Sequence, residues 1–547
     1  MPHHPVIRHL ITVMAFVGLF VALSLPNRLV WITPSAFLFF PLELLVIGFL
    51  LLIPGLAGRS VHALLAVMLG LGLLLRGTDL VTHEIFARRF NPVFDSHLLA
   101  DASRLLSGVL GSLASVLVVL GLVLVIALVC WLAYVMLGRI QRTLQSAPRL
   151  SAVTLLALLL VWGGLKAAGW SRADTFAWDQ LVAHGRDTLH SLQDIQEFNA
   201  TVGDDAATEL PADGLFSRLA GKDVYIVFAE SYGRVLLEQD PFRESITEKL
   251  SWAENTLEAE GLQMRSAFLT SPTVGGLSWL AHGTLLSGAW IDSENRYNSL
   301  MLSERLTLNR LFHKAGWRTV AGMPAISLAW PEGAYFGYDQ IYNAHNFGYE
   351  GLPFNWVTMP DQYVWSALQA RERSGQKRQP VMAEVAMISS HAPWTPNAHL
   401  VPWDQVGNGT IFNDQAQAGP TPEEVWSDVT TIRQYYRQSI EYMLEALVSY
   451  LREYGDDNLV VLILGDHQAA PMITGDPDNR DVPVHLIARD PAVIEAIESW
   501  HWQPGLMLEA DAPVWRMDEV RDRFVEAFSE PDTFSESDQY SELKEPN

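Results

Sequence analysis

Long apolar runs occupy the first 170 residues of this 547-residue chain and restrict its fold more than any other feature. Such runs are typical of membrane-crossing helices, because roughly 20 apolar residues span the hydrocarbon layer. We expect five spans, at residues 10–25, 36–57, 61–75, 109–137 and 152–168. The first should be retained, since further apolar runs follow it in place of a cleavage site and a soluble domain. Residues 1–170 are therefore predicted to form a transmembrane domain.

Basic residues in short loops predict the orientation of these helices. With the N-terminus in the cytoplasm, five arginines fall on the inner side: Arg8, Arg59, Arg139, Arg142 and Arg149. The loop 76–104, predicted to be external, also carries arginines, but acidic residues offset them. Five spans place everything after residue 170 outside. We expect a multi-pass protein of a bacterial inner membrane whose second half is periplasmic.

The net charge, the single cysteine and one glutamate further restrict the functions and covalent links that this chain can have. The formal net charge of −24 argues against nucleic acid as a partner. The single cysteine, Cys130, lies in an apolar run and excludes an intrachain disulfide. Glu43 lies within the second predicted span, where an ionisable group is a functional candidate. The plainer interpretation, which we favour, is an interfacial carboxylate that is neutralised or paired with a loop arginine.

The chain after residue 170 has the pattern of an α/β domain. Residues 171–220 are polar and are expected to form a juxtamembrane helical connector, and the acidic residues 529–547 a disordered tail. Between them, apolar runs predict buried strands at 224–229, 318–322, 382–388, 459–464 and 482–488. Residues 427–454 have helical periodicity. Strands alternating with helices favour a largely parallel central sheet.

Two of these predicted strands end in side chains that bind metals. The run Val224–Ser231 ends in Glu230, and the run after Leu459 ends in Asp466 and His467. Functional groups of open α/β sheets collect beyond the carboxyl ends of the strands, and mixed nitrogen and oxygen ligands suit zinc, manganese or related ions. The plain alternatives are a capping carboxylate at Glu230 and a turn-forming Asp with an incidental His.

Two further segments carry polar groups close to apolar runs. Ser278 follows a Gly-Gly turn and opens a helical run, which would place its hydroxyl at a helix N-terminus where an anion is stabilised. The alternative is that Ser278 is simply a helix cap. His391 follows another apolar run and is a candidate for binding a substrate anion, or a structural loop histidine.

In this order, the Glu230, Ser278, His391 and Asp466-His467 segments resemble the sulfatase-like branch of the alkaline phosphatase superfamily. The nearest likeness is to the membrane-anchored lipoteichoic acid synthase and phosphoglycerol transferase group, which carries five spans and an extracytoplasmic catalytic domain. The resemblance implies that residues 221–528 are a catalytic domain of that fold. It covers about residues 222–490 by motif and the N-terminal part by layout only.

The resemblance also implies roles for single residues. Glu230, Asp466 and His467 would bind a divalent metal, manganese, zinc or magnesium, with Ser278 as nucleophile and fourth ligand. Thr273 is the rival nucleophile, because the synthase group uses threonine. His391 matches the substrate-binding histidine, and His282 stands where sulfatases carry an arginine.

The sequence departs from the family pattern at two places, which limits the family properties that can be expected of this chain. The signature needed to make formylglycine is absent after Ser278, which argues against sulfate-ester hydrolysis. Gln468 follows His467 where the family has glycine.

Together these features predict metal-dependent transfer of a phosphoglycerol-like head group from a membrane phospholipid to a glycan or other hydroxyl acceptor, through a covalent intermediate on Ser278 or Thr273. One alternative keeps the fold and uses water, as a phosphodiesterase or phosphatase. Another is a polytopic transport or sensor protein whose outer domain only binds an anion; it predicts that Glu43 and the loop 76–104 matter more than the metal ligands. The aromatic-rich loop 327–357 is interpreted as a pocket wall, a lipid contact or packing.

Overall fold

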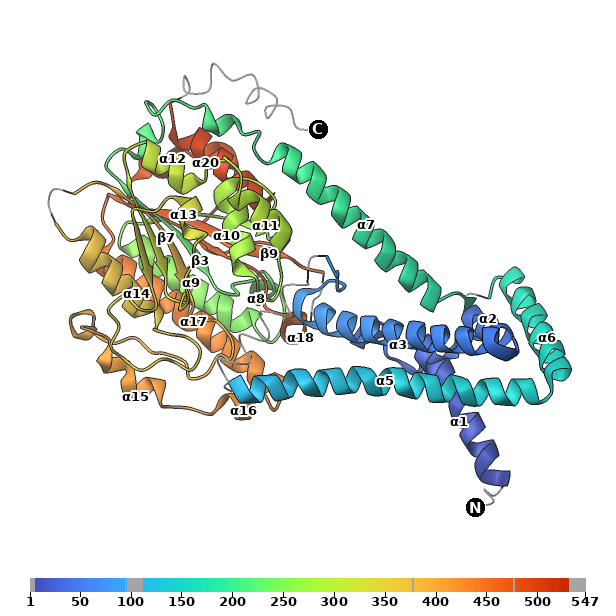
Figure 1. The fold of residues 1–547 in the computed structure, drawn as a ribbon. Coiled ribbons are helices and arrows are strands. Elements are labelled where there is room, and N and C mark those ends of the chain that lie inside the picture. Colours follow the sequence, from blue (N-terminus) through green and yellow to red (C-terminus); the bar gives the residue numbers. More distant parts are fainter. Residues whose placement is uncertain are drawn as a thin grey trace. The chain divides into compact units, whose positions relative to one another are not determined.

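The computed structural model describes residues 5–93, 95, 112–170, 172–375, 378–475 and 478–530. The chain divides into two compact units (Figure 1). Unit 1 comprises residues 1–84 and 88–196, and unit 2 comprises residues 85–87 and 197–547. The predicted acidic tail lies outside the described residues from 531 onward, while Ser529 is buried in unit 2.

Unit 1 is helical, and four of its helices are long and apolar enough to cross a membrane. These are α1 (Pro5–Ser24), α3 (Gly55–Phe86), α5 (Ser112–Ser146) and α6 (Pro148–Ala167). Unit 1 also contains α2 (Leu42–Leu51), most of α7 (Ala177–Thr201) and a small parallel pair of β1 (Phe40–Pro41) with β2 (Ala173–Asp174).

The prediction of five spans is wrong for the run 36–57. Only the ten residues of α2 are helical there, after a short 3-10 turn and β1. Pro41 has no N–H to donate, so the helix begins directly after it. Pro54 disfavours helical geometry at the residue before it, and α2 ends at Leu51. The described part of the chain therefore holds four helices of spanning length and one shorter apolar helix.

The predicted external loop 76–104 is also corrected. Residues 76–86 continue α3, and Arg76 and Asp79 are buried in unit 1. Arg76 donates to Gln180 Oε1 at 2.6 Å, and Asp79 accepts from His184 and Asn27. These partners let charged residues extend the helix beyond its apolar part. Residues 94 and 96–104 lie outside the described residues.

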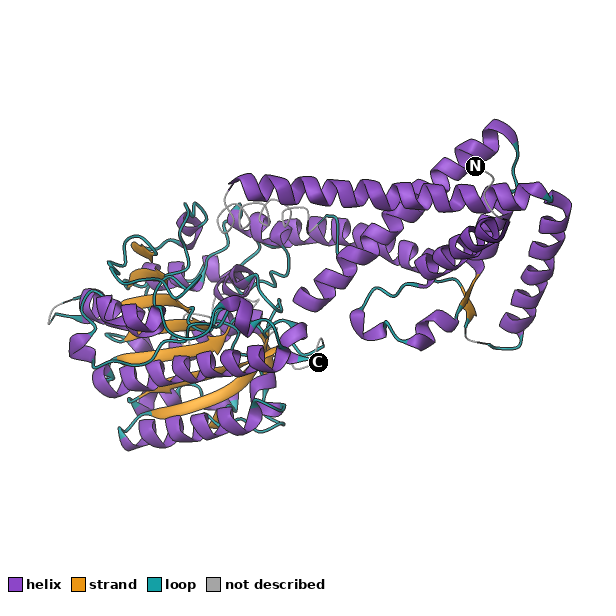
Figure 2. Ribbon diagram, turned by 90° about the horizontal axis from the view of Figure 1, so that it is seen from below, coloured by secondary structure: helices purple, strands orange, loops and turns teal. Residues whose placement is uncertain are grey.

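Unit 2 is built on a nine-stranded sheet in the order β10-β4-β9-β8-β3-β7-β5-β6, with β11 paired to β4 (Figures 1 and 2). The strands are β3 (Asp223–Ala229), β4 (Gln263–Thr270), β5 (Arg318–Met323), β6 (Gln340–Asn343), β7 (Val381–Met387), β8 (Leu459–Gly465), β9 (Asp481–Ala488), β10 (Gln503–Pro504) and β11 (Val514–Arg516). Strands β8, β3, β7, β5 and β6 are parallel, and β9 is antiparallel to both of its neighbours. The predicted class, an α-helical membrane domain followed by an α/β domain with a largely parallel sheet, is confirmed apart from the span number.

Helices cover both faces of this sheet (Figure 2). The helices are α8 (Val235–Glu238), α9 (Arg243–Ala259), α10 (Ser278–Ser287), α11 (Glu294–Met301), α12 (Leu308–Lys314), α13 (Gly333–Phe336), α14 (Asp361–Leu368), α15 (Asn413–Ala416), α16 (Pro422–Val425), α17 (Val429–Tyr454), α18 (Pro471–Thr474), α19 (Pro491–Glu495) and α20 (Val520–Phe528). Alternate residues of β3 enter different cores. Tyr225 and Val227 pack in the cluster with α9, α14 and α17, and Val224 and Ile226 pack in the cluster with α10, α12 and α20. Both faces of the strand are therefore buried, which explains its continuous apolar run.

Candidate metal and nucleophile site

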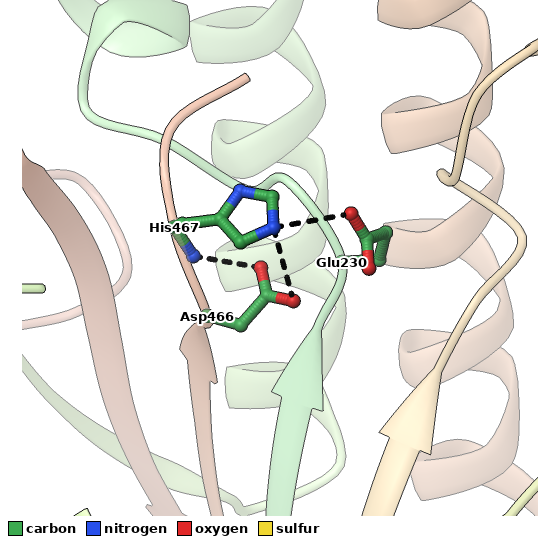
Figure 3. A group of neighbouring side chains, drawn as sticks. All are labelled: Glu230, Asp466 and His467. Carbon is green, nitrogen blue, oxygen red and sulfur yellow. Dashed lines mark hydrogen bonds and ion pairs between the residues drawn. The ribbon is translucent and has the colours of Figure 1, made fainter. Parts of the chain in front are cut away.

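The three predicted metal ligands meet at the carboxyl ends of two neighbouring strands. Glu230 directly follows β3, and Asp466 and His467 directly follow β8, which pairs with β3 in parallel register (Figure 3). One ligand atom from each residue lies within 4.8 Å of the other two. All three side chains are buried. Parallel pairing brings together residues that lie more than 230 positions apart in the sequence.

Backbone groups hold the two carboxylates in place. Asp466 Oδ1 accepts the N–H of Ser231 at 2.8 Å and that of His467 at 2.7 Å. Ser231 adopts a left-handed backbone conformation, with φ of 58°. This turn also lets its hydroxyl donate to Glu230 Oε1 at 2.8 Å. Ser231 is a residue that the sequence analysis did not assign, because a serine after a strand carries no distinctive signal.

The electrostatics of the two carboxylates differ. Burial together with the adjacent Glu230 raises the pKa of Asp466 to about 6. Burial also opposes ionisation of Glu230, but His391 and His467 hold the pKa of Glu230 below its ordinary value. The two buried carboxylates repel each other, and a cation between them would relieve that repulsion.

These residues fit a divalent metal ion. His467 Nδ1 donates to the carbonyl of Gln468 at 2.8 Å, which leaves Nε2 directed at the carboxylates, 3.4 Å from Glu230 Oε1 and 3.7 Å from Asp466 Oδ2. Such a backbone bond on the other ring nitrogen is the usual way in which a ligating histidine is oriented. The donor set of two carboxylates and one imidazole suits zinc or manganese.

Ser278 is brought to this cluster, and Thr273 is not. Ser278 is the first residue of α10, and its Oγ lies 3.3 Å from both Glu230 Oε2 and His467 Nε2. The turn before it needs positive φ at Gly275 and Gly276, which explains the Gly-Gly pair. The Thr273 hydroxyl is instead directed back to its own turn, where Oγ1 donates to the carbonyl of Gly276 at 2.7 Å.

The two candidate histidines have different surroundings. His391 lowers the pKa of Glu230, and its ring stacks on Trp356 with the centroids 4.3 Å apart. Trp356 was not singled out by the sequence. His282 instead contacts a second buried carboxylate: its Nδ1 lies 2.6 Å from Glu384 Oε1, and its ring stacks on Phe228.

The structure accommodates Gln468 and shows the role of several aromatic residues in the loop 327–357. The Gln468 side chain approaches Gly233, where an added Cβ would lie 1.6 Å from Gln468 Oε1, so a glycine at 233 makes room for the glutamine at 468. In the loop 327–357, Phe336 and Phe347 are buried in the two cores, and Trp330 stacks on Phe336. These aromatic residues contribute to packing.

Comparison with solved structures gives partial matches. The lipoteichoic acid synthase LtaP from Listeria monocytogenes is 15% identical, with a TM-score of 0.37, covering 59% of this chain and 76% of that one. The periplasmic domain of phosphoethanolamine transferase EptC from Campylobacter jejuni is 10% identical, with a TM-score of 0.35, covering 57% and 92%. The phosphoglycerol transferase GacH from Streptococcus pyogenes is 11% identical, with a TM-score of 0.32, covering 62% and 90%.

No protein-family model matches the chain, and no curated protein sequence matches it at a significant level. The TM-scores of the structural matches all lie below 0.5. The functional inference therefore rests on the site residues and not on these alignments.

Proposed function

We propose that this chain is a metal-dependent phosphotransferase, which moves a phosphoglycerol-like head group from a membrane phospholipid to a glycan or other hydroxyl acceptor. The observation that carries the proposal is the position of Ser278. Ser278 is the first residue of α10, and its Oγ lies 3.3 Å from both a carboxylate oxygen and an imidazole nitrogen of the candidate ligands. A hydroxyl with two proton acceptors at a helix N-terminus is suited to act as a nucleophile.

Glu230, Asp466 and His467 would hold a divalent cation, with Ser278 Oγ as a fourth ligand. When bound, that cation supplies a Lewis acid, which lowers the pKa of a coordinated hydroxyl and attracts charge from a phosphoryl oxygen. Manganese, zinc and magnesium are the candidates.

The chain's own residues carry the transfer in two steps. Ser278 Oγ loses its proton to solvent and forms a bond to phosphorus while the bond from phosphorus to the lipid oxygen breaks, and His391 gives a proton to the leaving diacylglycerol oxygen. The acceptor hydroxyl then attacks the same phosphorus and gives its proton to His391, and Ser278 takes up a proton from solvent as the serine–phosphorus bond breaks. His282, one helical turn after Ser278, is proposed to orient the phosphate.

The apolar helices of unit 1 support a membrane location, and we propose that unit 2 lies at the outer, periplasmic face of a bacterial inner membrane. A substrate with acyl chains and an anionic head group would be presented at that surface. Product analysis decides whether the acceptor is a hydroxyl compound or water, since the second outcome makes the chain a phosphodiesterase.

The test of this function is covalent trapping on the full-length protein. The purified parent, supplied with manganese and with vesicles of phospholipid radiolabelled in the head group, is expected to become labelled and to release diacylglycerol. Ser278→Ala should abolish both signals, while Thr273→Ala should keep them. If Ser278→Ala is labelled as strongly as the parent, Ser278 is not the nucleophile. If labelling is lost only in Thr273→Ala, Thr273 is the nucleophile instead.

A further inference from the structure

Unit 1 contains a large cavity that the proposed function does not use. Its volume is about 850 Å³, which falls within the range of roughly 300–1,000 Å³ for ligand sites. Residues from α1, α2, α3 and α7 line it, and all of them belong to unit 1. Most of the wall is apolar and comes from α2 and α3, including Leu50, Leu65 and Met68.

Few polar side chains line this cavity. Arg76 and Gln180 are hydrogen-bonded to each other, and Glu43 is hydrogen-bonded to the backbone at the beginning of α7. Glu43, Arg76, Gln180 and His184 all line the cavity. Arg76 donates through Nε to Gln180 at 2.6 Å and through Nη1 to the carbonyl of Ala22. Its guanidinium also lies over the Phe176 ring. Arg76 comes directly after the long apolar part of α3, so it occupies the position where a spanning helix reaches the interface.

Glu43 supplies a carboxylate oxygen that a ligand in this cavity could satisfy. Its Oε1 accepts the N–H groups of Phe176 and Trp178 at 2.8 and 2.9 Å, at the beginning of α7. Its Oε2 is buried and has no hydrogen-bond partner. An unpartnered buried carboxylate oxygen is costly, so the site favours a molecule that brings a donor. Within the described residues, no direct ion pair joins Glu43 to Arg76, so a ligand between them can contact both side chains.

The cavity thus combines a long apolar wall with one cationic group and one free anionic acceptor. A phosphate matches Arg76, a hydroxyl or ammonium group matches Glu43, and an acyl chain matches the leucine-rich wall. We propose that unit 1 binds one glycerophospholipid in this cavity, with an acyl chain along α2 and α3, the phosphate at Arg76 and a head-group donor at Glu43 Oε2. This site does not rest on the function proposed for Ser278, because its test measures bound lipid and not turnover.

Two glycines of α3 provide a matched pair of variants. Gly72 lines the cavity and Gly77 is exposed elsewhere on the helix, and a Cβ added at either meets no atom within 4 Å. Gly72→Leu therefore fills the cavity without a clash, while Gly77→Leu makes the same gain in helix propensity outside it. Glu43→Gln keeps an oxygen for the two N–H groups and replaces the free acceptor by an NH₂ donor.

The experiment is lipid retention by the full-length protein, measured by native mass spectrometry after reconstitution with phosphatidylethanolamine, phosphatidylglycerol or phosphatidylcholine of identical acyl chains. The parent and Gly77→Leu are expected to retain about one phospholipid per chain, and Gly72→Leu at least tenfold less. The first two lipids should exceed phosphatidylcholine, whose head group has no donor, by roughly tenfold, in line with a hydrogen bond to a charged group. Glu43→Gln should remove this preference.

Three results would overturn the proposal. The first is retention by Gly72→Leu equal to that by Gly77→Leu, and the second is a parent that retains no phospholipid. The third is displacement of the lipid by glycerol phosphate or ethanolamine phosphate alone, which would remove the role of the apolar wall. Equal binding of all three lipids by the parent would overturn the assignment of Glu43.

Discussion

The buried carboxylate of Glu384, in the middle of β7, accepts hydrogen bonds from three side chains. His282 Nδ1 lies 2.6 Å from Oε1, Asn309 Nδ2 lies 3.2 Å from Oε2, and the Tyr338 hydroxyl donates to Oε2 as well. Burial and this carboxylate together raise the pKa of Tyr338 well above its ordinary range. The contact with Glu384 fixes the orientation of the His282 ring, which suits a group proposed to orient a phosphate.

We therefore expect Glu384→Gln to act through His282. A neutral amide offers one acceptor oxygen to three donors, so His282 loses its fixed orientation and kcat should fall about tenfold, which corresponds to ~1.4 kcal/mol of transition-state stabilisation. In steady-state assays, His282→Ala combined with Glu384→Gln should be no slower than His282→Ala alone. Fully additive losses would show that Glu384 acts independently of His282.

Asp361 is a fully buried carboxyl at the start of α14, close to the His391 loop. Its Oδ1 accepts the N–H groups of Ile388 and Ser389, both at 3.0 Å, and its Oδ2 has no partner. Burial raises the pKa of Asp361 to about 6. The folded chain therefore binds this proton more tightly than the unfolded chain, whose carboxyl has an ordinary pKa near 3.8.

The sign of the pH effect follows from that difference. Folding stability should fall as pH rises from about 4 through 6, by about 3 kcal/mol, because only the unfolded carboxyl ionises freely there. Asp361→Asn should remove this loss, so that its advantage in the thermal midpoint over the parent grows between pH 4.5 and 7. The exposed Asp414→Asn is the control. A midpoint difference for Asp361→Asn that is the same at both pH values would contradict the assignment.

At the residue scale, the candidate ligands Glu230, Asp466 and His467 could be selected from the sequence because they follow continuous apolar strands, and the structure places them together. The sequence could not decide between Ser278 and Thr273, since both lie within one Gly-containing turn. Only the folded turn shows that Thr273 bonds back to Gly276 while Ser278 reaches the cluster. Glu384 was also missed, because a single acidic residue within a strand gives no indication of its partners.

At the scale of elements, an ion pair joins the N-terminal segment of unit 2 to its last helix, α20. Arg521 is 1% exposed and binds both oxygens of Asp205, at 2.6 and 2.9 Å. It also donates to the carbonyl of Leu306 and packs against Gly288, where an added Cβ would lie 2.6 Å from its Nε. Because Gly288 ends α10, the same arginine supports the helix that begins at Ser278.

Arg521→Met should lower the free energy of unfolding by about 3 kcal/mol, because the buried Asp205 carboxylate is then left with the longer, 3.8 Å ion pair with Arg305. Adding Asp205→Leu should recover part of this loss. Arg523→Met, which breaks the exposed pair with Glu519, should cost under about 1 kcal/mol. Denaturant unfolding followed by Trp fluorescence measures all three, and equal effects of the two arginine variants would contradict the prediction.

Strands with continuous apolar runs were predicted within one residue of their observed bounds, β9 included. The sequence missed β4, whose residues Gln263–Thr270 mix polar and apolar side chains. It could not show that β9 is antiparallel, because strand direction depends on the connections between elements and not on local composition. Residues 427–454 do contain the long helix α17, Val429–Tyr454.

At the scale of the whole molecule, unit 2 has the organisation of an independent domain. Both hydrophobic clusters that flank its sheet consist only of residues 198–528. A fragment of residues 197–530 should therefore fold without detergent, with circular dichroism of an α/β protein and a cooperative thermal transition. It should bind about one equivalent of manganese or zinc, and Asp466→Ala with His467→Ala should lose that metal. An insoluble fragment would show that folding depends on unit 1.

The membrane unit was predicted less completely than the sheet domain. Hydropathy identifies apolar length, so α1, α5 and α6 agree with the predicted spans. Hydropathy alone does not show that prolines interrupt the helix in the run 36–57. It also does not show that Arg76 and Asp79 bind residues of α7, which allows α3 to continue past its apolar part. Prolines therefore limit α2, and tertiary partners account for the length of α3.

The pairing of β3 with β8 has a consequence for the timing of synthesis. Glu230 and Ser278 leave the ribosome well before Asp466 and His467, and contacts across such long stretches of chain form late. Under the proposed function, a nascent chain carries the Ser278 hydroxyl for some time without two of the three candidate ligands. Activity would then begin only when almost the entire polypeptide has been synthesised, and the lipids of the compartment where the chain is made would be protected until that point.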